Sequence, residues 1–186
     1  GAADKYGFSS EQLAVMCGSH AGTDKHREVV LSNLKLAGNE PRHLQCGCHR
    51  PIWMEVANLY PTGGEDKDPV RHNCSGKHSG FLAQARYLGD PIEDYLNPSS
   101  KTQTLVLNTL SAYCEYDSKH MPSAPDGCSA PNYPLPLKNL ALGFKKGALD
   151  VMAELGEKES LRIIKKFQKE RPGFPGPGKS FSTYQN

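Results

Sequence analysis

Apolar side chains recur at helical spacing in several segments of the chain, and runs rich in Gly, Pro, Asn and Asp separate these segments. The pattern predicts helices over residues 9–17, 23–37, 51–59, 77–88, 101–114, 137–153 and 158–169. Continuous strands are hard to find. The chain is therefore expected to be mainly helical with few strands.

The first two of these helices have clear boundary signals. Ser9 with Gln12 three residues later forms a capping-box pattern, and Gly18 ends that helix. Thr23 is suited to cap the second helix, and Gly38 stops it. Ser19 and His20 are consequently expected in the turn between two helices.

The connections over residues 61–69, 89–100 and 118–136 are rich in turn residues, and the last is long for an ordinary loop. No repeat is visible. A length of 186 residues favours one domain, which we place at residues 1–170. The Pro/Gly-rich stretch 171–186 cannot sustain a helix or a central strand and is expected to be a flexible tail.

Composition narrows the classes of partner. The net charge of +2 is small and both signs are mixed along the chain, so nucleic acid is not expected as a partner. No run of 18 apolar residues is present, and no membrane partner is expected. The N-terminus lacks a secretory signal pattern, which favours a cytoplasmic location. Because Gly1 is not an initiator methionine, we expect either a removed leader or a piece of a longer chain.

Six cysteines leave two interpretations open. In a secreted protein they would form three disulfides, as in a disulfide-rich binding domain. A chain of this length with a patterned core does not need such crosslinks. We favour reduced thiols, some of them metal ligands.

The stretch 73–80, Asn-Cys-Ser-Gly-Lys-His-Ser-Gly, concentrates a thiol, an amine and an imidazole where an apolar helix begins. At a helix N-terminus the thiolate of Cys74 would be stabilised and its pKa lowered. Lys77 lies three residues on, on the same side of the helix turn. A metal-bound amine must be neutral, which requires a depressed pKa. The alternative is an inert cysteine beside a solvated lysine.

Three further groups carry chemistry. Asp126-Gly127-Cys128 offers a carboxylate to anchor an ammonium group and a second sulfur, although it is also a turn signal. Cys46-Gly47-Cys48-His49 offers soft ligands but lacks the usual zinc-knuckle spacing. Ser19 and His20 are a nucleophile and a base in type, yet adjacent residues on a turn rarely point together.

Three motifs in this order resemble the L-asparaginase II family. They are Met-Cys-Gly-Ser-His-Ala-Gly at 16–22, His-Asn-Cys-Ser-Gly-Lys-His-Ser-Gly at 72–80 and Pro-Asp-Gly-Cys-Ser-Ala-Pro at 125–131. Residues 45–51 are also similar to the family's Cys-Gly-x-His-x-Pro. The resemblance covers roughly residues 1–150.

The resemblance implies an α/β fold like that of serine beta-lactamases and penicillin-binding proteins, of which this chain would hold the mainly helical part. It also implies an amidohydrolase that converts L-asparagine to L-aspartate and ammonia by a serine nucleophile, in a homodimer. By the same resemblance Ser19 and Lys77 are catalytic, and Cys74, Lys77 and Cys128 bind zinc. Substrate-binding residues are then expected among the side chains Asp126, His78, His49 and Asn73.

This sequence also departs from the family pattern. The family's Ser-x-x-Lys motif, with the attacking serine and its base, is expected upstream of residue 1, and a second lysine cannot be placed after residue 150. Cys48 is an unexpected addition. The domain is therefore expected to be incomplete on both sides and the chain impaired in activity. The remaining alternatives are a non-catalytic zinc-binding member of the family and the unrelated disulfide-rich domain.

Overall fold

The computed structural model describes residues 1–156, 158–159, 162, 165–166 and 169, and it is mainly helical there. The α-helices are α1 (Ala2–Tyr6), α2 (Ser10–Met16), α3 (Asp24–Leu36), α4 (Ile52–Val56), α5 (Ser75–Leu88), α6 (Lys101–Cys114) and α7 (Leu137–Leu155). Short 3₁₀ turns are η1 (Pro41–His43), η2 (Glu65–Lys67), η3 (Pro69–Arg71), η4 (Ile92–Asp94) and η5 (Ser118–His120). Two strands of two residues each, β1 (Ala124–Pro125) and β2 (Pro131–Asn132), pair antiparallel.

Six of the helices expected from the sequence are present, and the mainly helical character is confirmed. Helix α1 and the 3₁₀ turns were not predicted, because each is too short to show a period. The expected helix 158–169 and the tail 171–186 fall largely or wholly outside the described residues. The beta-lactamase-like fold stays a prediction.

The chain divides into two compact units. The first comprises Gly1–Thr109 and Asp117–Pro134, and the second comprises Leu110–Tyr116 and Leu135–Asn186. The prediction of one domain over residues 1–170 stays a prediction. Every candidate site residue lies in the first unit.

The helix starts follow the capping chemistry read from the sequence. Ser9 Oγ accepts from the Gln12 backbone N–H at 3.3 Å, and the Gln12 side chain accepts from the Ser9 N–H at 2.8 Å. Thr23 Oγ1 accepts from the His26 N–H at 3.4 Å. These caps fix where α2 and α3 begin and so define the turn that joins them.

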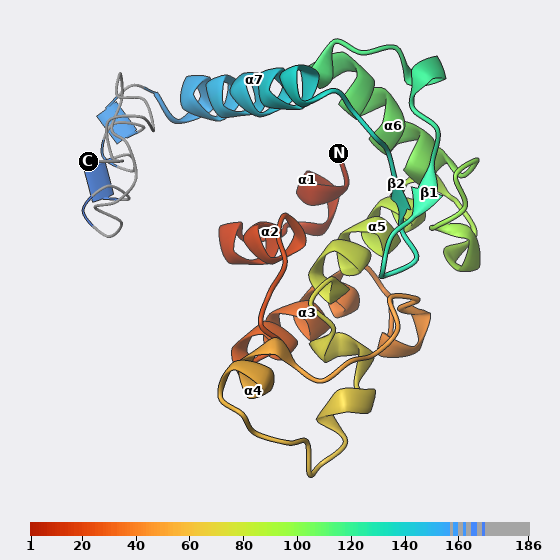
Figure 1. The fold of residues 1–186 in the computed structure, drawn as a ribbon, viewed down its shortest axis with the longest axis vertical. Coiled ribbons are helices and arrows are strands. Elements are labelled where there is room, and N and C mark those ends of the chain that lie inside the picture. The colour runs from red at the N-terminus through yellow and green to blue at the C-terminus, as the bar shows by residue number, and fades with distance from the viewer. Residues whose placement is uncertain (157, 160–161, 163–164, 167–168, 170–186) are drawn as a thin grey trace. The chain divides into compact units, whose positions relative to one another are not determined.

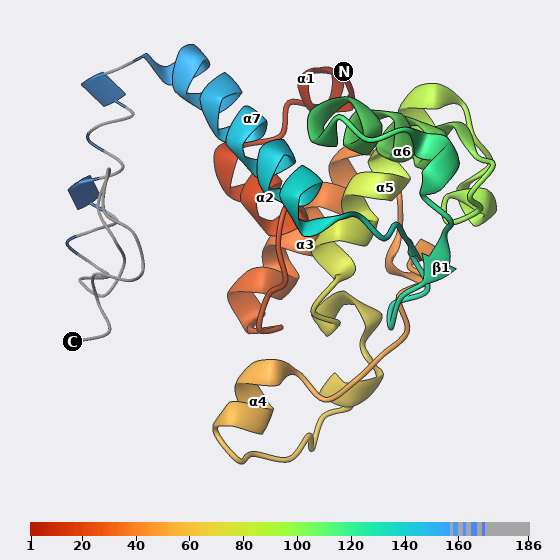
Figure 2. The ribbon, with the colours of Figure 1, turned by 45° about the horizontal axis from the view of Figure 1, so that its top comes forward.

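Helix α5 is the centre of the first unit, where it contacts α1, α2, α3 and η3 (Figures 1 and 2). The hydrophobic core around it is built from ten buried side chains: Val30, Leu34, Leu44, Cys46, Val70, Leu82, Ala85, Tyr95, Cys128 and Ala130. Two of these, Cys128 and Ala130, come from the loop between β1 and β2. The core therefore holds that loop against the start of α5.

Two glycines allow the backbone segments near the start of α5 to approach closely. A Cβ on Gly76 would lie 2.1 Å from the Val15 carbonyl oxygen, so α2 can rest on α5 only where residue 76 has no side chain. Gly22 has φ +73°, and a Cβ there would lie 2.5 Å from the Arg71 carbonyl oxygen. The turn after α2 is thus pressed against the segment that leads into α5.

The second unit is built on α7 and the end of α6. Gly143 faces Cys114, since a Cβ at residue 143 would lie 2.7 Å from the Cys114 sulfur. The Asn139 side-chain amide donates to the Cys114 carbonyl oxygen at 2.9 Å. No residue of α7 is buried within the described part of the chain, and Phe144 is 73% exposed.

Candidate functional site

Cys74 is the N-cap residue of α5, at the end of a turn formed by His72 and Asn73. The Cys74 backbone N–H donates to Nδ1 of His72 at 3.0 Å. Burial and the neighbouring Cys128 raise the pKa of the Cys74 thiol to about 11, although Lys77 lowers it. The expectation of a lowered pKa at the helix N-terminus is wrong for this structure, because loss of hydration outweighs the nearby positive charge.

The loop between β1 and β2 is folded by the Asp126 side chain. Asp126 Oδ1 accepts from the backbone N–H groups of Cys128 at 2.9 Å and Ala130 at 3.2 Å. Ser129 takes the left-handed conformation, with φ 67°. This carboxylate-closed turn directs the Cys128 thiol, which is 2% exposed, into the unit.

Side chains from the start of α5 and from this loop lie together in one cluster. Lys77 Nζ donates to Asp126 Oδ2 at 3.2 Å, and the Cys128 thiol donates to Asp126 Oδ1 at 2.9 Å. Cys128 also lies close enough to Cys74 and Lys77 to raise the pKa of both groups. The predicted metal ligands Cys74, Lys77 and Cys128 therefore lie near one another, and Lys77 and Cys128 both contact Asp126. Tertiary packing joins them across about fifty positions of sequence.

Charge in this cluster is arranged as an ion pair. Burial alone would lower the pKa of the Lys77 amine, but Cys128, Cys74 and Asp126 together raise it. Burial opposes ionisation of Asp126, yet hydrogen bonds from Cys128 and the charge of Lys77 lower its pKa to about 2. Lys77 is thus a cation here, and it must lose a proton before it binds a metal. The depressed pKa expected for a metal-bound amine stays a prediction.

His78 lies behind Cys128 and is completely buried. Tyr95 Oη accepts from the Gln45 N–H at 2.8 Å and lies 2.7 Å from His78 Nδ1. The Tyr95 hydroxyl therefore donates a hydrogen bond to Nδ1 of His78. The neutral ring then carries its N–H on Nε2, which lies 3.1 Å from the Cys128 sulfur. In this structure His78 orients Cys128; its expected contact with substrate stays a prediction.

Ser19 and His20 separate in space as their adjacency on a turn suggested. Ser19 is exposed, whereas His20 is 6% exposed and turns inward. His20 Nε2 lies 2.9 Å from Ser75 Oγ, a partner that the sequence reasoning missed. Ser75 belongs to the Cys-Ser-Gly-Lys motif, so its position inside the motif was the available signal.

His49 and Asn73 lie together as part of a shallow hollow that is also lined by Arg50, Ile52 and Glu55. His49 Nδ1 lies 2.6 Å from the Arg50 carbonyl oxygen, which it donates to, and Nε2 accepts from the Asn73 backbone N–H at 3.1 Å. The two predicted substrate-binding residues thus fix each other. The hollow next to the Cys74 turn is open to a small molecule.

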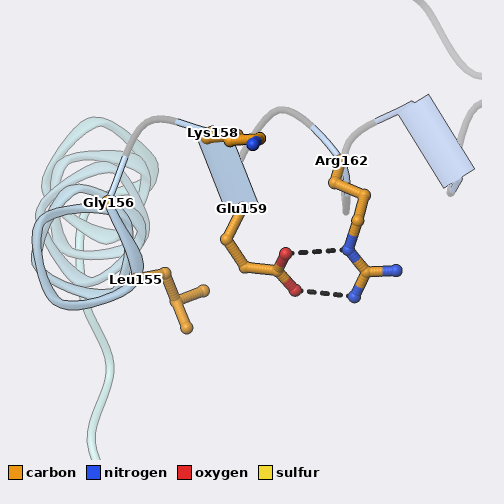
Figure 3. Close-up of a pocket in the computed structure, with 5 residues that line it drawn as sticks. All are labelled: Leu155, Gly156, Lys158, Glu159 and Arg162. Atoms are coloured by element: carbon orange, nitrogen blue, oxygen red, sulfur yellow. Dashed lines mark hydrogen bonds and ion pairs between the residues drawn. The ribbon is translucent and has the colours of Figure 1, made fainter.

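A second hollow lies in the other unit and is lined by Leu155, Gly156, Lys158, Glu159 and Arg162 (Figure 3). Its main polar feature is the pair in which Arg162 donates to Glu159 at 2.7 and 2.6 Å. None of the five was predicted as a site residue, and they bring together no nucleophile and base. We therefore assign the candidate site to the first unit.

The predicted donor set of Cys74, Lys77 and Cys128 has only part of the character of a zinc site. In the described part of the chain, no group of three or more His, Cys, Asp and Glu side chains is arranged to hold a metal ion. That finding includes Cys74, Cys128 and Asp126, and the predicted set has the Lys77 amine as its third ligand. The two thiols are donors of the kind that zinc prefers, so the set fits the ion in the type of two of its three donors. Zinc binding stays a prediction.

All six cysteines are free thiols in the structure. Two of them, Cys74 and Cys128, meet in the cluster and stay unbridged there. Cys48 is exposed, and its thiol donates to the Lys67 carbonyl oxygen at 3.2 Å. The arrangement offers no support for a disulfide framework.

Comparison with known families identifies the class of protein to which this fold and site belong. The family model described as L-asparaginase II matches residues 1–174. The chain therefore belongs to the L-asparaginase II family, which places it in general among asparaginase-like hydrolases acting on a small molecule. No curated protein matches the chain. Among the described residues, no helix has the length and apolar character needed to cross a membrane.

Proposed function

We propose that this chain carries the zinc-linked part of an amidohydrolase site that converts L-asparagine to L-aspartate and ammonia. The observation that carries the proposal is the convergence of Cys74, Lys77 and Cys128 with Asp126. Family membership supplies the reaction class. The Lys77–Asp126 hydrogen bond and the proximity of Cys74 to Cys128 support this location for the site within the chain.

The roles of the residues follow from their charge and exposure. Asp126 holds a negative charge suited to the α-ammonium group of an amino acid. His49 and Asn73 line the adjacent hollow and offer hydrogen bonds to the substrate's polar groups. Exposed Ser19 is one of two active-site serines, and Lys77 has a second, catalytic role beside its role as a ligand. Zinc, when bound, supplies a fixed positive charge that orients the substrate and polarises its carbonyl groups.

The reaction needs a serine oxygen to attack the side-chain amide carbon and expel ammonia, after which water cleaves the resulting ester to release aspartate. A neutral amine must accept the serine proton in the first step and return it to the leaving nitrogen. Within this chain, exposed Ser19 in the turn after α2 is assigned to support this step. The expected impairment of activity in this chain stays a prediction.

One observation favours a second candidate, a non-catalytic zinc-binding member of the family. Within the described part of the chain, the Ser19 side chain hydrogen-bonds to no lysine or histidine, and the neighbouring His20 is directed to Ser75. A serine without a base is a weak nucleophile. Zinc binding without any hydrolysis of asparagine by a longer natural chain would favour this candidate.

The test is the metal content per chain of purified protein. We expect one zinc per chain in the wild type and loss of that zinc in Cys74→Ala and in Cys128→Ala, because each substitution removes one of three ligands. Cys48→Ala is the matched control, since this exposed thiol lies outside the cluster. Absence of zinc from the wild type, or its loss in Cys48→Ala alone, would contradict the assigned ligands.

A further inference from the structure

His20 is a buried imidazole whose hydrogen bonds join two loops of the candidate site. It stands in the turn between α2 and α3, directly after Ser19. Its backbone N–H donates to the Asn73 carbonyl oxygen at 3.1 Å, and its ring reaches Ser75 at 2.9 Å. Asn73 and Ser75 are the two neighbours of Cys74.

The donors and acceptors around the His20 ring define a single tautomer. The Gly22 N–H donates to Nδ1 at 3.3 Å, so Nδ1 carries no proton. The neutral ring therefore has its proton on Nε2, where it donates to Ser75 Oγ. The Ser75 hydroxyl in turn donates a hydrogen bond to the Val70 carbonyl oxygen at 2.6 Å. Every polar atom in this chain of contacts has a partner of the correct type.

Both members of the ring contact are deeply buried. Ser75 is 0% exposed and is the first residue of α5, so it has no access to substrate. His20 stacks on the ring of His26, with ring centroids 5.1 Å apart. Burial, together with the charges that His26, His72 and His49 would carry, lowers the pKa of His20 to about 4. The ring thus acts as a fixed neutral donor at neutral pH.

Ser19 is positioned by this arrangement, because a residue next to a doubly anchored histidine has little freedom of its own. The same turn is held at two further points, where the Trp53 N–H donates to the Ala21 carbonyl oxygen at 3.1 Å and Arg71 donates to that of Gly22 at 2.9 Å. Among these contacts, only those of His20 reach the residues on both sides of Cys74.

We propose that His20 is a positioning residue that, through buried Ser75 and the Asn73 carbonyl, fixes the Ser19 turn against the turn that presents Cys74 and Lys77. This inference rests on the proposed function, since it assigns His20 to the same site. It predicts that loss of the His20–Ser75 contact loosens the metal ligands without removing any of them. Groups that orient metal ligands in this indirect way typically contribute about 10- to 100-fold to metal affinity.

The experiment is titration with Co²⁺ alone, followed by the thiolate-to-cobalt absorption, on the wild type, His20→Ala, His20→Gln, Ser75→Ala and the double variant His20→Ala/Ser75→Ala. We expect each alanine variant to weaken Co²⁺ binding about 10-fold. The glutamine side chain retains an N–H at the reach of Nε2, so His20→Gln should recover most of the affinity. The double variant should bind no more weakly than the weaker single variant, because both substitutions break one contact.

His26→Ala is the matched control, because it removes a neighbouring imidazole and leaves the His20–Ser75 contact in place; it should bind Co²⁺ like the wild type. A merely structural role predicts lower resistance to denaturant, read from the fluorescence of Trp53, with unchanged Co²⁺ affinity in the folded protein. Unchanged affinity in His20→Ala and Ser75→Ala, or additive losses in the double variant, would overturn the proposal.

Failure of the proposed function gives a different result, namely no Co²⁺ binding that depends on Cys74 and Cys128 in the wild type. The positioning role is then decided by hydrogen exchange of the backbone amides. We expect His20→Ala to accelerate exchange about 10-fold in both residues 19–22 and 73–75, since one contact restrains both turns. Acceleration confined to residues 19–22 would overturn the coupling.

Discussion

Helices α5 and α7 differ in the polarity of their sequences and in the burial of their residues. Helix α5 begins with small and polar residues, yet its buried positions include Ser75, Gly76, His78 and Ser79. Helix α7 carries a row of large apolar side chains, and none of its residues is buried in the described structure. Burial is therefore decided by the partners that a helix finds, and polar residues become buried where each has a hydrogen-bond partner.

The two helices also differ in chemistry. The polar side chains at the start of α5 pair with residues of α3, the β1–β2 loop and the turn after α2, and these pairs create the candidate site. The polar contacts of α7 in the second unit include an exposed one between Tyr113 and Asp150. A site that depends on buried polar contacts should be far more sensitive to substitution than an exposed helix.

The largest expected difference between the two helices is in the loss of stability when one leucine from each is replaced by alanine. Leu82 is 0% exposed in the core of the first unit, and Leu149 of α7 is 52% exposed. Leu82→Ala should lower the free energy of unfolding by about 2–5 kcal/mol, because it leaves a cavity. Leu149→Ala should change it by less than about 0.5 kcal/mol. Urea denaturation followed by Trp53 fluorescence and by circular dichroism measures both, and equal effects would invalidate the comparison.

Acid should destabilise the unit that contains the buried histidines. The pKa of His20 is about 4 in the folded chain, below the ordinary value of 6.5, chiefly through burial. Between these values the unfolded chain binds a proton that the folded chain does not. Stability is therefore full above pH 6.5 and falls as the pH drops toward 4, by about 3 kcal/mol for His20.

The measurement is urea denaturation at several pH values between 4 and 7. His72, with its pKa lowered to about 4, and His78, to about 3, act in the same direction, in both cases mainly through burial. His20→Gln is the control, and it should show a shallower pH dependence than the wild type. A variant with an unchanged slope would show that His20 is not neutral in the folded protein.

The smallest expected difference between the two helices is in the change of stability when one glycine from each is replaced by alanine. A Cβ at residue 76 would lie 2.1 Å from the Val15 carbonyl oxygen, whereas at residue 147 the nearest atom is Cε1 of Tyr113 at 3.9 Å. Gly76→Ala should cost about 1–3 kcal/mol by forcing α2 away from α5. Gly147→Ala should gain up to about 1 kcal/mol from helix propensity. A Gly76→Ala protein as stable as the wild type would show that α2 can shift at no cost.

Local structure was largely predictable from the sequence. The caps at Ser9 and Thr23 and the apolar spacing located α2 and α3 because these signals act over a few residues. The start of α5 was placed two residues late, at Lys77 instead of Ser75, since Ser and Gly carry no helical period. The left-handed turn at Ser129 had no signal in residue type.

The members of the candidate site were identified from motifs, but their contacts were not. The pairing of His20 with Ser75 and of Tyr95 with His78 joins residues 55 and 17 positions apart, which no local pattern encodes. The direction of the pKa shift at Cys74 was also missed. Burial and neighbouring charges decide such shifts, and both arise only after the chain has packed.

The sequence by itself determined the family, the positions of the main helices and the residue types able to bind a metal or an amino acid. Only the tertiary structure decided that Cys74, Lys77, Cys128 and Asp126 meet, that His20 turns away from Ser19, and that α5 is buried while α7 is exposed. The physical reason is the separation along the sequence over which each interaction acts. Capping and periodicity act within a few residues, whereas desolvation, close backbone approach at Gly76 and hydrogen bonds across the core depend on segments brought together by folding.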